Sequence, residues 1–440
     1  QNDNYYTLGF LASNVCFAIL GILNPTLNYQ AGNIKSLPII YEKVETVDNI
    51  VKQNIGISKN DWDSFETSWD VQTHPLLKYG ISMVTGLGDV RPDGSLPASY
   101  YGIDETSGGT KIYEKGRPKH YTLQSAYQMW QQACNASFTQ LKSNEEELNR
   151  IFIEIYGLQD ELAPDVAEKD VTVHYIADTK EAAPEGLRNS NYLLTKKDVV
   201  ISLLSYAVGC MFGRYSLDTP GLAYAGGEWD AGKYTSFIPD QDNILPITDE
   251  EYFPDDITGL FCAWLKKAYG ADTLDDNLDF IADALGNKGN KSSEVIRNYF
   301  INDFYEDHCK TYKKRPIYWL FDSGKQNGFK ALIYMHRYNE NTIGNLRVDY
   351  LHRMERVYEN ELTRMQDIIT NSADARDVAA ATKRKEKLQK QLKECKDYDE
   401  KIAHLALARI TIDLDDGVKV NYEKVQTGAD GKKYEVLGKV

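Results

Sequence analysis

KTYKKRPIYWLFDSGKQNGFKALIYMHRY, residues 310–338, combines two apolar runs with several turn-forming residues. Residues 317–321 are an unbroken apolar and aromatic run, which is typical of a buried strand. Residues 329–336 alternate between a drier and a wetter face, the pattern of a second strand. Because Asp322-Ser323-Gly324 and Asn327-Gly328 between these runs are turn formers, the sequence predicts a β-hairpin.

The same stretch carries an excess of positive charge. It holds seven Lys and Arg residues and one acidic residue, Asp322, which gives a local charge of +6 in a chain of net charge −15. Lysine and arginine neutralise phosphates and aromatic faces stack on bases, so this composition favours contact with a nucleic acid. A solvated basic face is the simpler alternative. The aromatic side chains are predicted to fill the hairpin core, which leaves the flanking cations and the loop 325–327 for function.

The composition is that of an ordinary globular protein. The chain has 440 residues, of which 42% are hydrophobic and 26% charged, enough for two or three cores. Six scattered cysteines without CxxC spacing predict free thiols in a reducing compartment. The seven histidines lack an HExxH pairing, so the sequence predicts no zinc site.

The apolar residues 8–23 raise the question of a membrane segment. The stretch is shorter than the ~20 residues that a spanning helix needs, Ser13 and Asn14 interrupt it, and no basic region precedes it. We therefore expect a buried helix that ends before Asn24-Pro25, no membrane segment and a cytoplasmic protein.

Negative charge is concentrated just before the basic stretch. Residues 240–283 hold twelve acidic residues against Lys266 and Lys267, a net charge of −10. DNA binding depends on a local patch, so the acidic total does not exclude it. The acidic segment is either a solvated helical face or a surface that keeps DNA off one side.

Hydrophobic spacing predicts a chain rich in helices. Residues 89–118, rich in Gly, Pro and Ser, are expected to form a loop, and the alternation from Val171 to Tyr175 a short strand. Helices are expected over residues 8–23, from a Ser58 N-cap toward Trp69, twice within 121–156, and over 196–213, 257–269, 274–285 and 293–312.

Residues 342–396 give the clearest architectural signal. Apolar residues step by three or four before and after Thr370-Asn371-Ser372, which predicts two charged helices in an antiparallel hairpin. This hairpin is either folded on the body of the protein or a projecting arm that clamps DNA or a partner. Alternation at 418–422 and the turn Asp430-Gly431 predict a small C-terminal β unit. The expected fold is therefore helix-rich α+β, with helical segments around small β units and a long antiparallel helical hairpin near the C-terminus.

Motifs for known catalytic chemistries are scarce. No GxxxxGK[ST] loop, GxSxG elbow or nucleophilic-cysteine signature occurs, and Gly86-Leu87-Gly88 is more typical of a turn than of a cofactor loop. Pro164-Asp165 and Asp178-Thr179-Lys180 match a loose PD…DxK pattern, in which two carboxylates hold a divalent metal ion beside a lysine. The pattern is short and recurs by chance. A metal-dependent nuclease is the alternative that cleavage abolished by Asp178→Ala would support.

Five longer segments resemble one family. They are YYTLGFLASNVCFAILGILNPTLNYQAGNIKSLPI (5–39), NEEELNRIFIEIYGLQDEL (144–162), ISLLSYAVGCMFGRYSLD (201–218), KRPIYWLFDSGKQNGFKALIYMHRY (314–338) and DLDDGVKVNYEKV (413–425). They look like the C-terminal half of PglX-type proteins, the adenine-specific DNA methyltransferases of bacterial BREX phage-defence systems. The resemblance spans essentially the whole chain.

The resemblance implies an S-adenosylmethionine-dependent enzyme whose catalytic motifs do not occur in this sequence. The family's methyltransferase domain carries a Gly-rich loop for the methyl donor and an Asn-Pro-Pro-Tyr motif that holds the flipped adenine. Asn24-Pro25-Thr26 lacks the second Pro and the Tyr. No catalytic, cofactor-binding or metal-binding residue is therefore assigned. We predict that this chain alone neither binds the methyl donor nor methylates DNA, which a methyl-transfer assay on the isolated 440 residues tests.

For this chain the resemblance implies target recognition and structural support. The side chains that usually read base edges are Arg, Lys, Asn and Gln. The residues themselves favour base-edge contacts from Arg315, Lys325, Gln326, Asn327, Lys330 and Arg337, phosphate contacts from Lys313 and Lys314, and further contacts from Arg214 and Lys233 in Gly-rich surroundings.

Double-stranded DNA and the missing methyltransferase domain are the expected partners, with other BREX proteins or a DNA-mimicking phage inhibitor as further ones. The alternative function is a protein-interaction scaffold that docks such proteins and has little affinity for DNA. Six segments are predicted: the end of a target-recognition region (1–57), a helical spacer (58–165), a mixed connecting region (166–256), helices with the basic hairpin (257–341), the antiparallel helical hairpin (342–409) and a C-terminal β unit (410–440).

Overall fold

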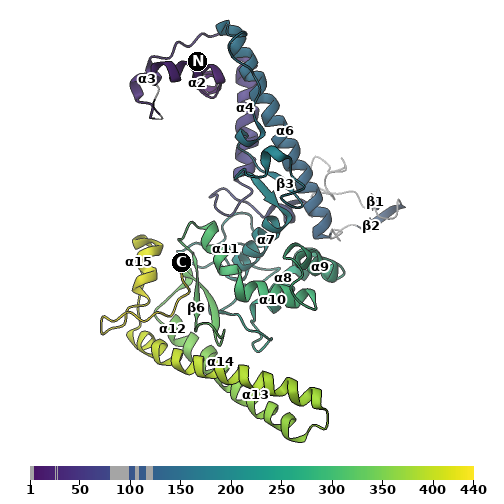
Figure 1. The fold of residues 1–440 in the computed structure, drawn as a ribbon, viewed down its shortest axis with the longest axis vertical. Helices are drawn as coiled ribbons and strands as arrows, with labels where there is room; N and C mark the ends of the chain where they lie inside the picture. Colours follow the sequence, from purple (N-terminus) through teal and green to yellow (C-terminus); the bar gives the residue numbers. More distant parts are fainter. Residues whose placement is uncertain (1–3, 25, 27, 80–98, 105–108, 115–121) are drawn as a thin grey trace. The chain divides into compact units, whose positions relative to one another are not determined.

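The computed structural model describes residues 4–24, 26, 28–79, 99–104, 109–114 and 122–440, and Figure 1 shows them as a ribbon. The chain forms two compact units: residues 1–79 with 125–199, and residues 80–124 with 200–440. The six-segment division stays a prediction.

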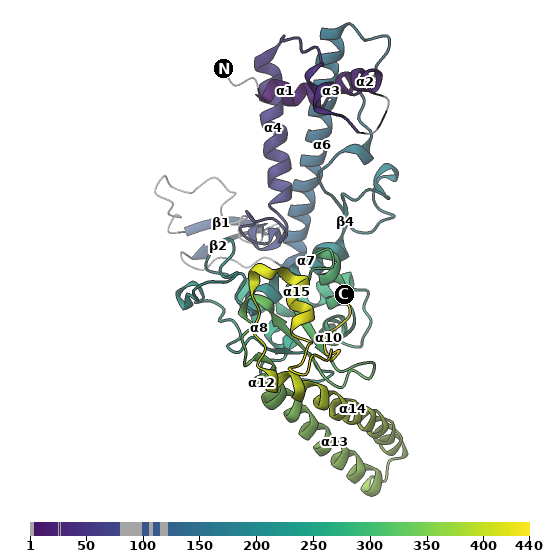
Figure 2. The ribbon, with the colours of Figure 1, turned by 90° about the vertical axis from the view of Figure 1, so that its left-hand side faces the viewer.

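The first unit is built on two long helices. α4 (Val44–Trp62) and α6 (Leu123–Tyr156) run alongside each other in both views (Figures 1 and 2). α1 (Asn4–Leu11) crosses them at Gly9, where a Cβ atom would lie 2.9 Å from Val51 Cγ2. The close approach of α1 and α4 therefore depends on the missing side chain at this position.

The single helix predicted over residues 8–23 is wrong, because the chain forms α1 and then α2 (Asn14–Leu23), bent by 70°. Ser13 makes the break: its Oγ donates to the Phe10 carbonyl at 2.7 Å and accepts from the Cys16 amide at 3.3 Å. The predicted end before Asn24 is confirmed. Within the described ranges no single helix is long and apolar enough to cross a membrane, although this bent pair passes the same test jointly.

α6 is one helix of 34 residues where two were predicted. Polar residues along it make tertiary hydrogen bonds instead of ending the helix. Asn135 bonds both the amide and the carbonyl of Ile176, and Asn144 Nδ2 donates to Asn54 Oδ1 at 2.8 Å. The predicted N-cap at Ser58 is also wrong, since Ser58 lies inside α4.

The small strands differ in detail from the prediction. β3 (Tyr175–Ala177) pairs in parallel with β4 (Leu193–Thr195), so the strand expected from Val171 begins later. The loop predicted over 89–118 contains an antiparallel pair, β1 (Ser99–Asp104) and β2 (Gly109–Glu114). The Gly86–Gly88 turn lies outside the described residues.

The second unit is organised around a three-stranded antiparallel sheet of order β5-β7-β6. β6 (Tyr318–Asp322) and β7 (Lys330–Tyr334) form the predicted hairpin, in register so that Leu320 faces Leu332. The short β5 (Leu245–Pro246) pairs with the other edge of β7. Trp319 and Phe321 are fully buried, which confirms that these aromatic residues belong to the core.

Helices surround this sheet. α7 (Lys196–Met211), α8 (Ile257–Tyr269) and α9 (Leu274–Ala284) agree with the prediction. The helix predicted over 293–312 is two helices, α10 (Ser292–Asn302) and α11 (Phe304–Thr311). Asp303 between them has a φ of −118°, outside the helical range.

The long helical hairpin is confirmed: α13 (His352–Asn371) and α14 (Ala375–Ala408) run antiparallel (Figure 2). It follows α12 (Thr342–Asn345) and a π-helical turn, Leu346–Leu351. The base of the hairpin is fastened to the sheet region. Tyr358 Oη donates to the Gly328 carbonyl at 2.8 Å, and Tyr398 Oη donates to the Val436 carbonyl at 2.7 Å.

The strand predicted at 418–422 is wrong, because these residues lie in the helix α15 (Gly417–Lys424). The core-facing residue is Asn421, fully buried, whose Nδ2 donates to the Gly417 carbonyl at 3.1 Å. A polar residue at that position conceals the helical period and leaves an apparent alternation of Val418 and Val420. The fold class predicted from the sequence, helix-rich α+β, is confirmed.

Candidate nucleic-acid interface

A tight turn after α11 presents three consecutive cations, Lys313, Lys314 and Arg315. Lys313 and Lys314 have φ values of 49° and 61°, the left-handed conformation common just after a helix. The Lys314 amide donates to the Cys309 carbonyl at 2.8 Å, which closes the turn. All three side chains are exposed, so the turn presents positive charge to solvent.

His308 fixes the strand that follows this turn. Its Nε2 accepts hydrogen bonds from the amides of Ile317 and Tyr318, both at 3.1 Å. Burial, with a smaller contribution from the charge of Arg214, lowers the pKa of His308 to about 3. The ring is therefore neutral near pH 7 and accepts both bonds.

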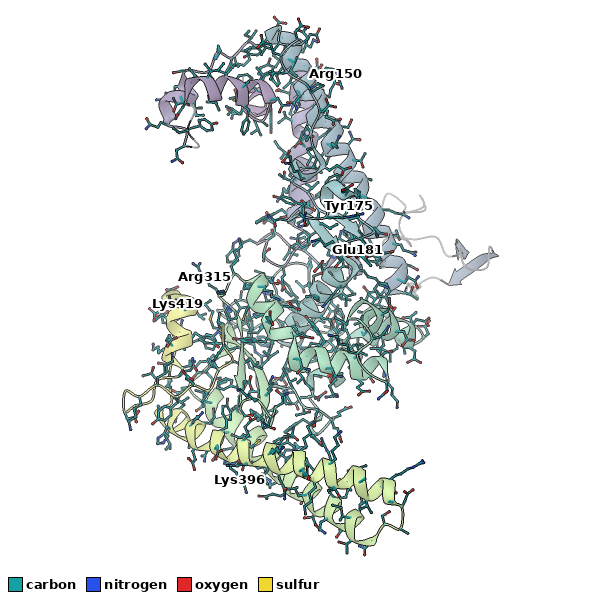
Figure 3. All side chains as sticks on the ribbon, viewed as in Figure 1. Arg150, Tyr175, Glu181, Arg315, Lys396 and Lys419 are labelled. Atoms are coloured by element: carbon teal, nitrogen blue, oxygen red, sulfur yellow. The ribbon has the colours of Figure 1, made fainter. Side chains whose placement is uncertain are left out.

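Two further cations lie close to this turn, around a surface cavity of about 540 Å³. Lys314, Lys419 of α15 and Lys439 all line the cavity. Figure 3 labels Arg315 and Lys419 on neighbouring parts of this surface. We call Lys313, Lys314, Arg315, Lys419 and Lys439 the basic rim.

The positive charge of the basic rim is not neutralised by ion pairs. Glu423, which also lines the cavity, pairs with Lys433, and Lys310 in the preceding helix pairs with Glu306 at 2.9 Å. Within the described residues no carboxylate pairs with a side chain of the basic rim. Unpaired, exposed cations are the groups that attract a phosphate backbone and displace its counterions.

The β6–β7 loop holds the candidates Lys325, Gln326 and Asn327. Its backbone is fastened to α14, because Glu394 accepts the amides of Gln326 at 2.8 Å and Gly328 at 3.0 Å. The Lys325 and Gln326 side chains are exposed, and that of Asn327 is half-buried. The loop thus presents two free side chains on a fixed backbone, and their contact with DNA stays a prediction.

Two candidate lysines donate hydrogen bonds to main-chain carbonyls inside the fold. Lys330 Nζ donates to the Ile301 carbonyl at 2.9 Å and lies 3.8 Å from Asp322. Lys233 Nζ donates to the Ala223 carbonyl at 2.8 Å. Both ammonium groups hold segments of the second unit together.

Two candidate arginines are also internal. Arg337 donates to the Asp240 carbonyl at 2.8 Å and lies over the Trp229 ring, 4.6 Å from its centroid. Arg214 is 9% exposed and donates to the Tyr334 hydroxyl at 3.1 Å. We therefore leave Arg337, Arg214, Lys330 and Lys233 out of the proposed interface.

Lys419 and Lys439 were missed by the sequence reasoning. The strand expected at 418–422 obscured the helical position of Lys419. Nothing in the sequence near Lys439 indicates that it lines the same cavity as Lys314. The exposed Lys residues of the C-terminal segment were the available signal, but only the fold brings them to the turn after α11.

An acidic cluster in the same unit is half-buried. Asp240, Asp242 and Asp255 place carboxylate oxygens within 4.8 Å of one another, and Tyr350 Oη donates to Asp242 at 2.8 Å. Burial, followed by the Asp242 charge, raises the pKa of Asp240 to about 7. A carboxyl whose pKa is raised on folding makes the folded state less stable as the pH rises from about 4 to 7.

Asp240→Asn is therefore expected to stabilise the protein at high pH. At pH ~8 the partly buried Asp240 carboxylate is ionised and destabilises the folded protein. The asparagine carries no charge, so the Tm of the variant is expected to be about 2–4 °C higher. The gain shrinks as the pH is lowered from ~7 toward ~4, because the carboxyl of the folded protein is then protonated and no longer carries a charge. Thermal unfolding followed by circular dichroism at several pH values measures the difference. A gain of the same size at every pH contradicts the assignment.

Asp165 and Asp178 of the PD…DxK pattern belong to no cluster of three or more possible metal ligands in the described part of the chain. Asp178 accepts a hydrogen bond from Tyr127 Oη at 2.9 Å. Across the described ranges the group of three or more such ligands close enough to share an ion is Asp240, Asp242 and Asp255. Cleavage by Asp165 and Asp178 stays the alternative that Asp178→Ala tests.

The exposed basic rim is the type of surface that binds a polyanion. The chain is 41% identical over 424 residues to "Adenine-specific methyltransferase PglX" of Lacticaseibacillus casei (strain Zhang). It is 33% identical over 438 residues to "Adenine-specific methyltransferase BrxX" of Escherichia coli O9:H4 (strain HS). Each alignment covers 96% of this chain. No protein-family model matches.

The predicted resemblance to the PglX family of adenine-specific methyltransferases is therefore confirmed, and the match runs along almost the whole chain. The chain spans about a third of the length of these relatives, 31% of PglX and 32% of BrxX.

Proposed function

We propose that this chain is the DNA-recognition and helical-support portion of an S-adenosylmethionine-dependent adenine-N6 DNA methyltransferase that acts in BREX phage defence. The supporting observation is the basic rim, five exposed cations without a carboxylate partner among the described residues, on a chain of net charge −15. The names of the two relatives support the reaction, because both are adenine-specific methyltransferases.

In this proposal the basic rim binds the phosphate backbone and sets the register of the protein on DNA. The exposed Lys325 and Gln326 at the end of the β6–β7 hairpin are then the candidates for base edges. The fixed loop backbone favours this role, because a side chain on a rigid support loses less freedom when it binds.

The acidic helix α9 is consistent with a one-sided interface. It carries Asp275, Asp276, Asp279 and Asp283, and Figure 1 shows it on the opposite side of the view from α15. A negative surface repels the phosphate backbone, so this arrangement favours approach of DNA from the side of the basic rim.

The salt dependence of DNA binding tests the proposed function. A fluorescence-anisotropy titration of a labelled duplex is expected to show an affinity that falls steeply as salt rises, with a slope of about −0.9 per phosphate contact. A residual preference among duplexes of different sequence is expected as well. Negligible DNA binding together with tight binding of a protein partner would instead support the alternative scaffold function.

A further inference from the structure

The first helices of the chain contain no charged residue. From Asn4 to Ile34 the sequence has no Asp, Glu, Lys, Arg or His, whereas 26% of the whole chain is charged. This stretch includes α1, α2 and most of α3 (Ala31–Lys35), all in the first unit. A helix that faces water normally carries polar and charged side chains on its outer face, so this composition calls for a cover.

One face of α2 is built into the core of the first unit. Val15, Cys16 and Leu20 are buried in a cluster that includes residues of α6. The Asn14 amide donates to Asn149 Oδ1 of α6 at 2.9 Å. Figure 2 shows α2 at one end of α6. These contacts hold α2 in a fixed position.

The opposite face of α2 is also apolar, but it is exposed. Phe17 is 66% exposed and Ile22 is 83% exposed. Gly21 lies four residues after Phe17 on the same face, and a Cβ atom there would meet no atom within 4 Å in the described part of the chain. We call Phe17, Gly21 and Ile22 the open face of α2. A helix that is apolar on all sides is normally buried on all sides, and exposed apolar patches mark interaction sites.

A lipid bilayer is a poor match for the open face. Helices that lie on a membrane combine an apolar face with a face rich in Lys and Arg, and α2 has no charged residue. The face opposite the open face is packed against protein, so lipid cannot surround the helix.

The relatives offer a cover within one polypeptide. This chain spans 31% of PglX and 32% of BrxX, so about two thirds of each relative lies outside the match. A covering surface in the same polypeptide is present at a high effective concentration, whereas a second copy of the chain is not. The lengths therefore favour a cover from the same polypeptide over a symmetric dimer.

We propose that the open face of α2 is the docking surface for the part of the methyltransferase polypeptide that lies outside the match. The occupant is an uncharged, apolar patch of that part, into which Phe17 and Ile22 pack, while Gly21 permits close approach. This inference rests on the part of the proposed function in which the chain belongs to a longer methyltransferase. It does not rest on DNA binding by the basic rim, so each proposal can fail alone.

Hydroxyl-radical footprinting of Phe17, followed by peptide mass spectrometry, tests this docking surface. The isolated chain is compared with a joined protein, in which the chain replaces the third of the Lacticaseibacillus casei PglX that it matches. In the isolated chain Phe17 is expected to be oxidised much faster than Phe10, which is fully buried. In the joined protein this difference is expected to be lost, because docking buries Phe17 as well. If the joined protein does not fold, the natural PglX and its own matching third provide the same comparison at the residues aligned with 14–23.

Gly21→Arg tests the surface by blocking it. The new side chain extends into open space in the isolated chain, but in the joined protein it would bury a charge against the apolar cover. Oxidation of Phe17 in the joined protein is therefore expected to return to the rate of the isolated chain. Gly56→Arg is the matched control, because Gly56 is an exposed glycine inside α4 with equally open surroundings. It should leave the protection intact.

Four results would overturn the proposal. Two of them are equal oxidation of Phe17 in the isolated and joined proteins, and protection that persists in Gly21→Arg. The third is protection of the isolated chain by phosphatidylcholine vesicles, which would show a lipid partner. The fourth is protection that grows with the concentration of the isolated chain, which would show that a second copy covers the open face.

Discussion

Replacing Lys313, Lys314 and Arg315 together by alanine is expected to weaken duplex-DNA binding by about 10- to 100-fold at ~0.1 M salt. The three side chains are exposed and form no ion pair with any residue in the described part of the chain. Their removal therefore costs the free energy of phosphate contact without disturbing an internal ion pair. The dependence of log K on log salt is expected to become shallower by about 2.7, because each contact contributes about 0.9.

The matched control removes the same charge elsewhere in the same unit. Lys383, Lys390 and Lys393 are exposed on α14, and alanine favours helix at all three positions. This variant is expected to bind DNA nearly as well as the unmodified chain. An equal loss of affinity in both variants would mean that DNA binding depends only on the total charge of the chain. A loss of affinity in the α14 variant alone would favour a helical hairpin that clamps DNA.

Arg297→Met is expected to lower the free energy of unfolding by about 3–5 kcal/mol. The Arg297 guanidinium donates to Asp256 Oδ2 and to the Thr248 carbonyl, both at 2.8 Å, and Asp256 is fully buried. The other oxygen of Asp256 caps α8 by accepting the amides of Thr258 and Gly259. Removal of the arginine leaves this capping carboxylate buried without a positive partner.

Urea unfolding measures this loss, with Arg364→Met as the control. Arg364 pairs with Glu361 on the surface of α13, its side chain is 60% exposed, and such a pair contributes at most about 1 kcal/mol. The double variant Asp256→Asn with Arg297→Met is expected to recover part of the loss, since it no longer buries a charge. If both single variants lose the same small amount, the buried pair is not what holds α10 to α8.

Much of the fold could be predicted from periodicity. The β6–β7 hairpin and the α13–α14 pair have apolar residues at spacings of two and of three to four, and both formed as expected. Errors arose where a polar side chain replaced an apolar one in the pattern. Asn421 hides the period of α15, and Asn135 and Asn144 lie inside α6 because they bond to distant segments.

The candidate site shows a different limit. Residue type and local charge were enough to predict Lys313, Lys314 and Arg315 as DNA-contacting residues, and all three are exposed on the turn after α11. The same signals could not show that the Arg337 and Lys330 side chains form hydrogen bonds inside the fold, because their acceptors are main-chain carbonyls of residues distant in sequence. Arg337, for example, donates to the carbonyls of Phe212 and Asp240, 125 and 97 residues away. Only the folded chain decides which cations stay free.

Lysine-acetylation footprinting with and without a duplex DNA shows whether the basic rim is the surface that binds DNA, because it reports each lysine separately. DNA is expected to protect Lys313, Lys314, Lys419 and Lys439, while Lys383, Lys390 and Lys393 on α14 stay reactive. Protection restricted to α14, or no protection at the basic rim under conditions where the chain binds DNA, would contradict it.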